Sequence, residues 1–183
     1  MPPPREPRVL LRAPVAADGA AFVELRRASR AELEPFEAFP PGGPDPFSAA
    51  AFERFLATAD SPRRRRRVVE RREDGTLVGA LSLTGIARGV LQSAALDYWL
   101  GTPFVGRGYM GEALALALDD AFGVLGLQRV EALVLPENAR SRRLLERARF
   151  QSEGLARGVV RVRGEWRDHE RWARIASDGG DQG

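Results

Sequence analysis

Residues 98–125 constrain the fold of this 183-residue chain more than any other segment. They begin at the end of an apolar stretch, residues 94–100, that is typical of a strand. A glycine-rich turn follows. From residue 106 to 126 apolar side chains then recur at spacings of three and four, which predicts the longest helix of the chain. A strand, a tight turn and a helix in this order favour a layered α/β architecture.

The turn itself has the properties of an anion-binding site. Backbone N–H groups at a helix start attract negative charge, glycine lets the backbone approach a phosphate closely, and an arginine in the turn adds a permanent positive charge. A phosphate or pyrophosphate is therefore the expected ligand, and a tight turn without a ligand is the alternative. The turn lacks the Gly-Lys-Ser/Thr of a Walker loop and the G-x-G-x-x-G of a dinucleotide site. Its residues are Val105, Gly106, Arg107, Gly108, Tyr109 and Met110.

The rest of the chain supplies the other elements of one α/β domain. The pattern predicts strands at residues 9–13, 67–72, 77–84, 94–100, 129–135, 154–163 and 168–175, and helices at residues 16–33, 48–56, 106–126 and 141–149. This order describes a mixed sheet with helices on both faces. We expect a single domain over residues 9–176, a flexible N-terminus over residues 1–8 and a disordered tail over residues 177–183.

The composition excludes several kinds of chemistry. Cysteine and lysine are absent, so there is no thiolate nucleophile, zinc–cysteine cluster or Schiff-base lysine. His169 is the single histidine, which rules out a multi-histidine metal site, and no metal is expected. No apolar run approaches the roughly 18 residues that span a bilayer, and residues 1–7 lack the apolar segment of a signal peptide. We therefore expect a cytoplasmic protein without membrane contact.

Several segments resemble one protein family, the GNAT acetyltransferases. Residues 105–110 resemble the family's acetyl-CoA pyrophosphate loop, Q/R-x-x-G-x-G/A, from which Val105 and Met110 depart. Other stretches match the family's fifth strand and the helix after it, or its RimJ/RimL branch, which acetylates ribosomal proteins at their N-termini. These stretches are residues 130–132, 136–141, 144–146, 86–94 and 164–169. Together they cover residues 9–175 in the family's order and spacing.

This resemblance implies a fold and a co-substrate. The GNAT fold has a mixed, mostly antiparallel sheet that is splayed at its centre, with helices on both faces. The pantetheine arm of acetyl-CoA would lie in the gap and pair with the backbone near Trp99 and Leu100, as an added strand does. Residues 105–110 would hold the pyrophosphate. Asn138 would face the pantetheine amides, cap the helix that starts at Ala139, or do both.

The resemblance also suggests catalytic residues. Acetyl transfer needs a neutral amine and a group that protonates the leaving thiolate. Many GNAT enzymes use a tyrosine for the second task, but the matching residue here is Leu145. The RimL-like branch uses a serine, matched by Ser141, which could instead stabilise only its helix turn. Asp97 and Glu131 remain as candidates for the base that accepts the proton of the amine through water, and we assign this role to Glu131. Either carboxylate could equally be a surface or ion-paired group.

The acceptor and partners stay open. We expect the N-terminal α-amine of a protein, such as a ribosomal protein. The alternatives are a small amine, such as an antibiotic or polyamine, and a catalytically weak module that binds acetyl-CoA or the ribosome. The arginine run that begins at Arg63 and ends at Arg67 is either a solvated loop or a contact for ribosomal RNA or an acidic peptide. The protein is expected to be a monomer or a homodimer.

Overall fold

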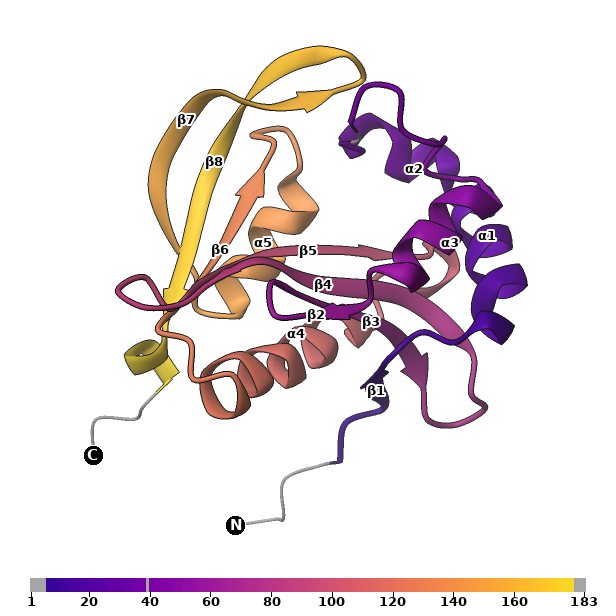
Figure 1. The fold of residues 1–183 in the computed structure, drawn as a ribbon, viewed down its shortest axis with the longest axis horizontal. Helices are drawn as coiled ribbons and strands as arrows, with labels where there is room; N and C mark the ends of the chain where they lie inside the picture. The colour runs from indigo at the N-terminus through magenta and orange to yellow at the C-terminus, as the bar shows by residue number, and fades with distance from the viewer. Residues whose placement is uncertain (1–5, 39, 180–183) are drawn as a thin grey trace.

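The computed structural model describes residues 6–38 and 40–179 (Figure 1). Residues 180–183 of the predicted disordered tail (177–183) and residues 1–5 of the predicted flexible N-terminus (1–8) therefore lie outside the described residues. Residues 177–179 of that tail belong to a 3₁₀ helix, Ala176–Gly179. The strands are β1 (Val9–Arg12), β2 (Asp60–Ser61), β3 (Arg64–Arg71), β4 (Leu77–Ala87), β5 (Ser93–Leu100), β6 (Arg129–Val134), β7 (Gln151–Val162) and β8 (Glu165–Ile175). The α-helices are α1 (Gly19–Ala28), α2 (Arg30–Leu33), α3 (Ala49–Ala57), α4 (Tyr109–Asp119) and α5 (Ala139–Arg147).

The strands form one mixed sheet in the order β1-β3-β4-β5-β6-β8-β7, and β2 pairs with β3. Its neighbouring strands are antiparallel except β5 and β6, which are parallel because α4 carries the chain across between them. Across the described residues, β5 and β6 pair only where residues 93–95 lie beside residues 129–131. Beyond Ala95 the two strands separate. The predicted central splay and fold class are thereby confirmed.

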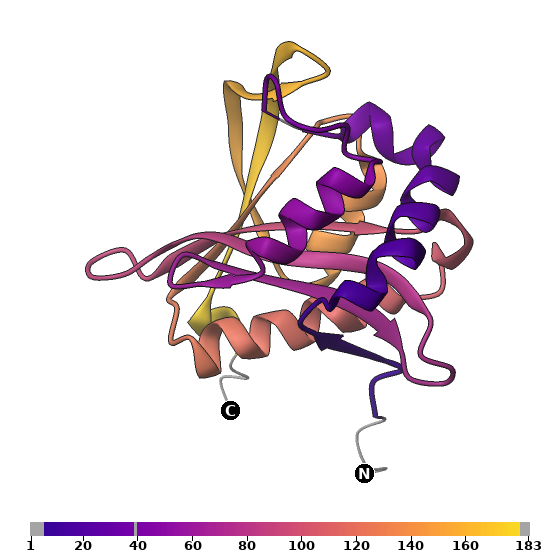
Figure 2. The same cartoon turned by 45° about the vertical axis from the view of Figure 1, so that its right-hand side comes forward.

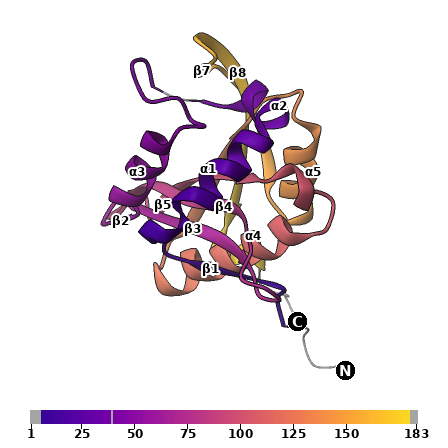
Figure 3. The same cartoon turned by 90° about the vertical axis from the view of Figure 1, so that its right-hand side faces the viewer.

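Helices cover both faces of the sheet, and each face has its own apolar core. On the α1 face, α1 and α3 pack over β3, β4 and β5 with Phe22, Phe52, Val68 and Ala80 at the centre. On the opposite α4 face, α4 and α5 pack against a larger cluster that includes Leu114. Figures 2 and 3 show these helices on either side of the sheet. The α1 and α3 layer does not extend over β6 and β8, so that part of the α1 face stays open (Figure 1).

The predicted helix over residues 16–33 is broken at Ser29. This serine is fully buried, and its hydroxyl accepts a hydrogen bond from the Thr102 backbone N–H at 2.9 Å. A serine that uses its hydroxyl for such a tertiary contact ends α1, and the chain restarts as α2. The break therefore ties the end of α1 to the loop that follows β5.

Four of the five arginines of the run, residues 64–67, belong to strand β3, so the interpretation as a solvated loop is wrong for them and holds only for Arg63. Arg64 is the first residue of β3, and successive side chains of this strand point to opposite faces of the sheet. Arg65 and Arg67 line a cavity of about 300 Å³ on the α4 face, together with Leu116. Arg66 instead stacks over Phe55 of α3 on the α1 face, at 5.1 Å.

Two smaller features complete the frame around the splay. Arg149, which follows α5, has a φ of 61°, the left-handed conformation that favours glycine at a helix C-terminus. Ala38, after α2, forms an isolated bridge to Val162 at the tip of the β7–β8 hairpin. That bridge joins the N-terminal helical layer to the hairpin above the open part of the sheet (Figure 1).

Candidate active site

The gap between β5 and β6 is the centre of the candidate site. From residue 96 to residue 100, β5 pairs with β4 on one side, and β6 no longer lies beside it on the other. Trp99 and Leu100 are in this segment. The Trp99 ring packs edge-on against Phe22 at 5.1 Å, and the Leu100 side chain packs on the α4 face. The segment is thus held on one side, while its other edge pairs with no described strand. Its pairing with the pantetheine arm stays a prediction.

The glycine-rich turn lies at the start of α4. Gly106 and Gly108 have φ values of +80° and +84°, which favour glycine strongly. Gly108 is the N-cap residue and has no side chain to accept from the first N–H groups of α4. These amides are left for an anion, so the geometry agrees with the proposed pyrophosphate role of residues 105–110.

Arg8, which directly precedes the edge strand β1, contacts this turn. Its backbone N–H and its Nε donate to the Glu112 carboxylate at 2.6 and 2.7 Å, and a terminal guanidinium nitrogen donates to the Arg107 carbonyl at 2.7 Å. The guanidinium also lies 5.0 Å from the centre of the Tyr109 ring. Sequence reasoning missed Arg8 because the sequence gives no signal for a contact that spans about a hundred residues.

Ser141 lies in the first turn of α5. The Asn138 side-chain oxygen accepts from the Ser141 backbone N–H at 3.1 Å, so the N-cap role expected for Asn138 is confirmed. The Ser141 hydroxyl makes a short hydrogen bond with the Tyr98 hydroxyl, which comes from β5. Burial raises the pKa of Tyr98 to about 12, although the bond to Ser141 works in the other direction. Tyr98 therefore stays protonated, and its hydroxyl can act as a donor.

Asp97, the residue before Tyr98, projects from the α1 face. Strand pairing places it in one row with Ser82 and Arg66. Its side chain reaches solvent, yet protein flanks it closely enough that burial raises the pKa of Asp97, against the opposite effects of Arg26 and Arg66. Asp97 and Tyr98 thus flank the splay from its two faces.

Glu131 lies on the same face as Asp97, beside Ala95. Its carboxylate accepts from Arg129 Nε at 2.6 Å, and Arg129 also forms an ion pair with Glu153. The structure therefore places Glu131 in a network of charged groups, whereas Asp97 forms no ion pair among the described residues. The structure brings together Ser141, Asn138 and Tyr98, and it leaves Glu131 one row of the sheet away from Asp97.

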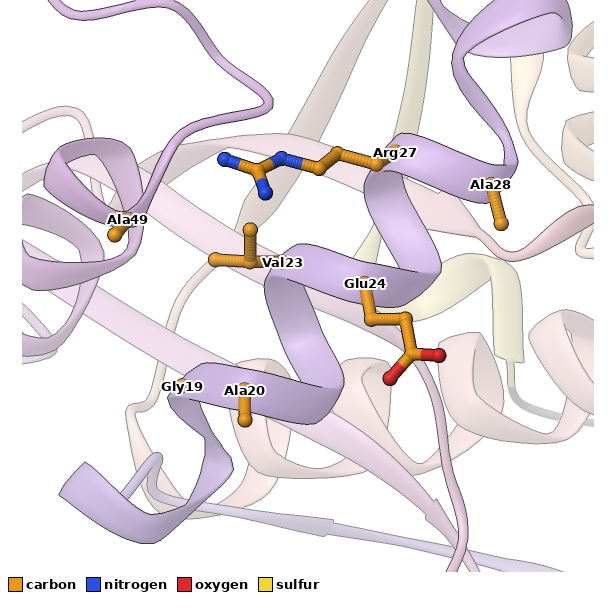
Figure 4. Close-up of a pocket in the computed structure, with 7 residues that line it drawn as sticks. All are labelled: Gly19, Ala20, Val23, Glu24, Arg27, Ala28 and Ala49. Carbon is orange, nitrogen blue, oxygen red and sulfur yellow. The ribbon is translucent and has the colours of Figure 1, made fainter.

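Other candidate positions are separate from this site. His169 is buried in β8, where its Nδ1 faces the Arg167 carbonyl at 3.1 Å. Within the described ranges, no group of histidine, aspartate and glutamate side chains could hold a metal ion. A surface cavity of about 550 Å³ between α1 and α3 shares no residue with the splay, and the Arg27 side chain extends across it (Figure 4). No helix in the described part of the chain has the length and apolar character to cross a membrane.

The fold and the site define a class: an α/β domain whose splayed sheet meets a glycine-rich helix start without a side-chain cap. Comparison with known families agrees, because residues 8–151 match the model of the acetyltransferase (GNAT) domain. The chain belongs to the GNAT acetyltransferase family.

Individual relatives resemble different parts of the chain. RimJ from Mycobacterium smegmatis, solved in complex with CoA-disulfide, superposes with a TM-score of 0.86 at 34% identity and covers 94% of this chain and 84% of its own. Two curated relatives align over 97 residues: Bacillus subtilis "Probable N-acetyltransferase YjcK" at 46% identity, and the Escherichia coli [ribosomal protein uS5]-alanine N-acetyltransferase at 32%. The alignments cover 53% of this chain, and the chain spans about half the length of these curated relatives.

The fold alone extends to proteins with other acceptors. Spermidine N-acetyltransferase from Vibrio cholerae, solved with CoA and spermine, has a TM-score of 0.77 at 23% identity. The fold is therefore shared by proteins that bind quite different amines, and the acceptor has to be argued from the site.

Proposed function

We propose that this chain transfers the acetyl group of acetyl-CoA to the N-terminal α-amine of a cytoplasmic protein, with a ribosomal protein as the expected acceptor. The observation that carries the proposal is the placement of Asp97 and the Tyr98–Ser141 pair on opposite faces of the splay. Similarity to RimJ over 94% of the chain supports the acceptor class.

Residues on the α4 face would hold acetyl-CoA. The amides of residues 105–110 suit a pyrophosphate, and the free edge of residues 96–100 suits the pantetheine amides. Asn138 already accepts from Ser141 through its oxygen, so its NH₂ group is the part that remains for pantetheine. This arrangement would place the thioester near the point where the strands separate.

Asp97 is the proton acceptor that the geometry favours. A carboxylate with a raised pKa takes up a proton more readily than one stabilised by an arginine. Asp97 is in that state, whereas Glu131 shares Arg129 with a second carboxylate. We therefore place Asp97 first and keep Glu131 as the second candidate, each acting through water.

Ser141 is the proposed donor to the leaving thiolate, and Tyr98 orients it. A neutral Tyr98 can donate its hydrogen to the Ser141 oxygen, which leaves the serine's own hydrogen free to point toward sulfur. Tyr98 and Ser141 lie on the α4 face, opposite the α1 face from which the amine would approach. Proton removal and proton delivery are thus separated by the sheet.

The ionisation of the acceptor amine also favours an α-amine. With a pKa of about 7.7, roughly one α-amine in six is already neutral at pH 7, whereas a lysine amine with a pKa near 10.4 is neutral in only about 0.04% of molecules. A single carboxylate that works through water suits the first acceptor far better.

Free thiol release from acetyl-CoA tests the proposal. Peptides with a free N-terminal Ala or Ser are compared with N-terminally blocked peptides that carry an internal lysine, and with spermidine. We expect turnover with the free N-termini. Equal turnover of the blocked lysine peptides contradicts the proposal, and turnover of spermidine alone assigns the protein to small-amine acetylation. Binding of acetyl-CoA without any turnover identifies a binding module.

A further inference from the structure

A strip of charged side chains crosses three strands on the α1 face. Strand pairing places Arg66, Ser82 and Asp97 in one row across β3, β4 and β5. The adjacent row begins at Arg64 on β3 and continues to Ala95 on β5. Positive charge therefore lies at the β3 end of the strip, and negative charge lies at the β5 end, beside the splay.

The arginines at the β3 end lack partners of opposite charge. No described carboxylate forms an ion pair with Arg54, Arg64 or Arg66, and the Nε atoms of Arg64 and Arg66 are buried without a hydrogen-bond acceptor in the described chain. Burial and then the positive charge of Arg64 lower the pKa of Arg66. The negative charge of Asp97 acts in the opposite direction, and Arg54 lowers the pKa further. Like charges held together in a partly buried place repel one another unless an anion neutralises them.

The β5 end has the complementary character. Asp97 is solvent-accessible. Glu37, from the segment after α2, has a pKa raised first by burial and further by the negative charge of Asp97. Arg26 pairs with Glu37 at 2.6 Å and leaves Asp97 without an ion pair among the described residues. A cationic amine is therefore attracted to this end and an anion to the other.

The separation of the two ends is set by the sheet. Neighbouring strands lie about 4.8 Å apart, so the backbones of β3 and β5 are about 10 Å apart at this row. An extended peptide rises about 3.4 Å per residue, so about three residues span the strip. A peptide whose α-amine lies at Asp97 would thus place its third or fourth residue over the arginines.

We propose that the preferred acceptor is a protein N-terminus with a carboxylate side chain at about its third or fourth residue, and that Arg64 and Arg66 bind this carboxylate. The proposal rests on the proposed function, because the α-amine at Asp97 fixes one end of the peptide. It adds a determinant of sequence specificity that lies on β3, two strands away from the splay.

Matched peptides test this inference. Peptides that begin with Ser or Ala would carry Glu at residue 2, 3, 4 or 8, each paired with the same peptide carrying Gln, and kcat/KM would be measured for every peptide. We expect Glu at residue 3 or 4 to raise kcat/KM about tenfold over Gln, equivalent to about 1.4 kcal/mol, and Glu at residue 8 to have no effect. Added salt should reduce the preference.

Three variants locate the determinant. Arg66→Gln and Arg64→Gln should reduce the Glu-to-Gln ratio to near one, whereas Arg65→Gln, on the α4 face of the same strand, should leave it unchanged. The ratio compares two peptides on one variant, so it does not depend on how much of that variant is folded.

The outcomes separate the two proposals. Acetylation of all N-termini without a preference for Glu overturns the carboxylate site and leaves the proposed function intact. A preference that survives in Arg66→Gln and Arg64→Gln also overturns it. Turnover confined to an amine that carries a phosphate, such as an aminoacyl nucleotide, refutes the peptide acceptor. Absence of any N-terminal acetylation refutes both proposals.

Discussion

At the scale of single residues, Ser141 and Tyr98 should act as one unit. We expect Ser141→Ala to lower kcat by about 100-fold or more with little change in the KM for acetyl-CoA, because proton donation matters in the transition state. Tyr98→Phe should lower kcat less, since Tyr98 works through the serine hydroxyl.

Steady-state kinetics of the double variant checks this coupling. Ser141→Ala with Tyr98→Phe should be no slower than Ser141→Ala alone, because the tyrosine then has no serine hydroxyl to orient. Ser152→Ala, at an exposed position on β7, is the matched control and should behave as wild type. If kcat of the double variant fell by the product of the two single decreases, the assignment of Tyr98 as a positioning residue would be contradicted.

Asp97 should lower stability while supporting activity. Its pKa is raised in the folded protein, so the folded state binds the proton more tightly than the unfolded chain does. Its contribution to stability is therefore lost as the pH rises from the unfolded pKa through the folded one. We expect Asp97→Asn to raise the melting temperature near pH 7 and to lower kcat.

Thermal unfolding at two pH values tests the sign. The gain from Asp97→Asn should shrink in acid, near pH 4, where the wild-type carboxyl is increasingly protonated in the folded state. The activity of the wild type should fall over the same pH range, because a protonated Asp97 cannot accept a proton. If Asp97→Asn had wild-type activity and wild-type stability, the base would be assigned to Glu131 instead, and Glu131→Gln would check this.

At the scale of elements, the start of α4 should tolerate no side chain at Gly108. A Cβ there would lie 3.1 Å from the Arg8 guanidinium, and the φ of +84° is strained for a β-branched residue. We expect Gly108→Val to weaken acetyl-CoA binding at least tenfold by calorimetry. Gly123→Val, at a site with no heavy atom within 4 Å of the added Cβ, is the control. Unchanged affinity in Gly108→Val would refute the pyrophosphate assignment.

The contact between β1 and α4 should preorganise the same turn. Arg8 binds both Glu112 and the Arg107 carbonyl, so Arg8→Gln removes the guanidinium from the turn. We expect acetyl-CoA affinity to fall severalfold and the fold to persist, because the Arg8 side chain is about two-fifths exposed. Titration calorimetry with circular dichroism would check both. Wild-type affinity in this variant would mean that the turn keeps its shape without Arg8.

Sequence patterns predicted those elements whose signal is local. The apolar period of α4 and the Asn138 cap follow from neighbouring residues, and the splay followed from family resemblance. The Tyr98–Ser141 bond and the Arg8 contacts join residues far apart in the sequence, so no local pattern indicates them. The start of β3 was missed because a run of arginines lacks the apolar alternation of a strand, although strand pairing buries part of each arginine.

At the scale of the whole molecule, the unequal coverage of the sheet separates the two substrates. α4 and α5 cover the α4 face, where the proposed acetyl-CoA site lies, while α1 and α3 cover only the β3 to β5 half of the α1 face. The Ala38–Val162 bridge joins the segment after α2 to the β7–β8 hairpin above the uncovered part (Figure 1). An acceptor and a co-substrate could thus enter from opposite sides and meet at the one place where the sheet is open.

The short pairing of β5 with β6 also affects how resistant the protein is to unfolding and proteolysis. Residues 93–95 and 129–131 join an N-terminal half-sheet, with β1, β3, β4 and β5, to a C-terminal one, with β6, β8 and β7. A ligand that pairs with both free edges would close this seam and would bind only the folded chain, which raises the free energy of unfolding with its concentration. The half-life of the protein against proteolysis should then increase with the acetyl-CoA concentration. Its level should therefore be higher in cells with abundant acetyl-CoA than in cells with little.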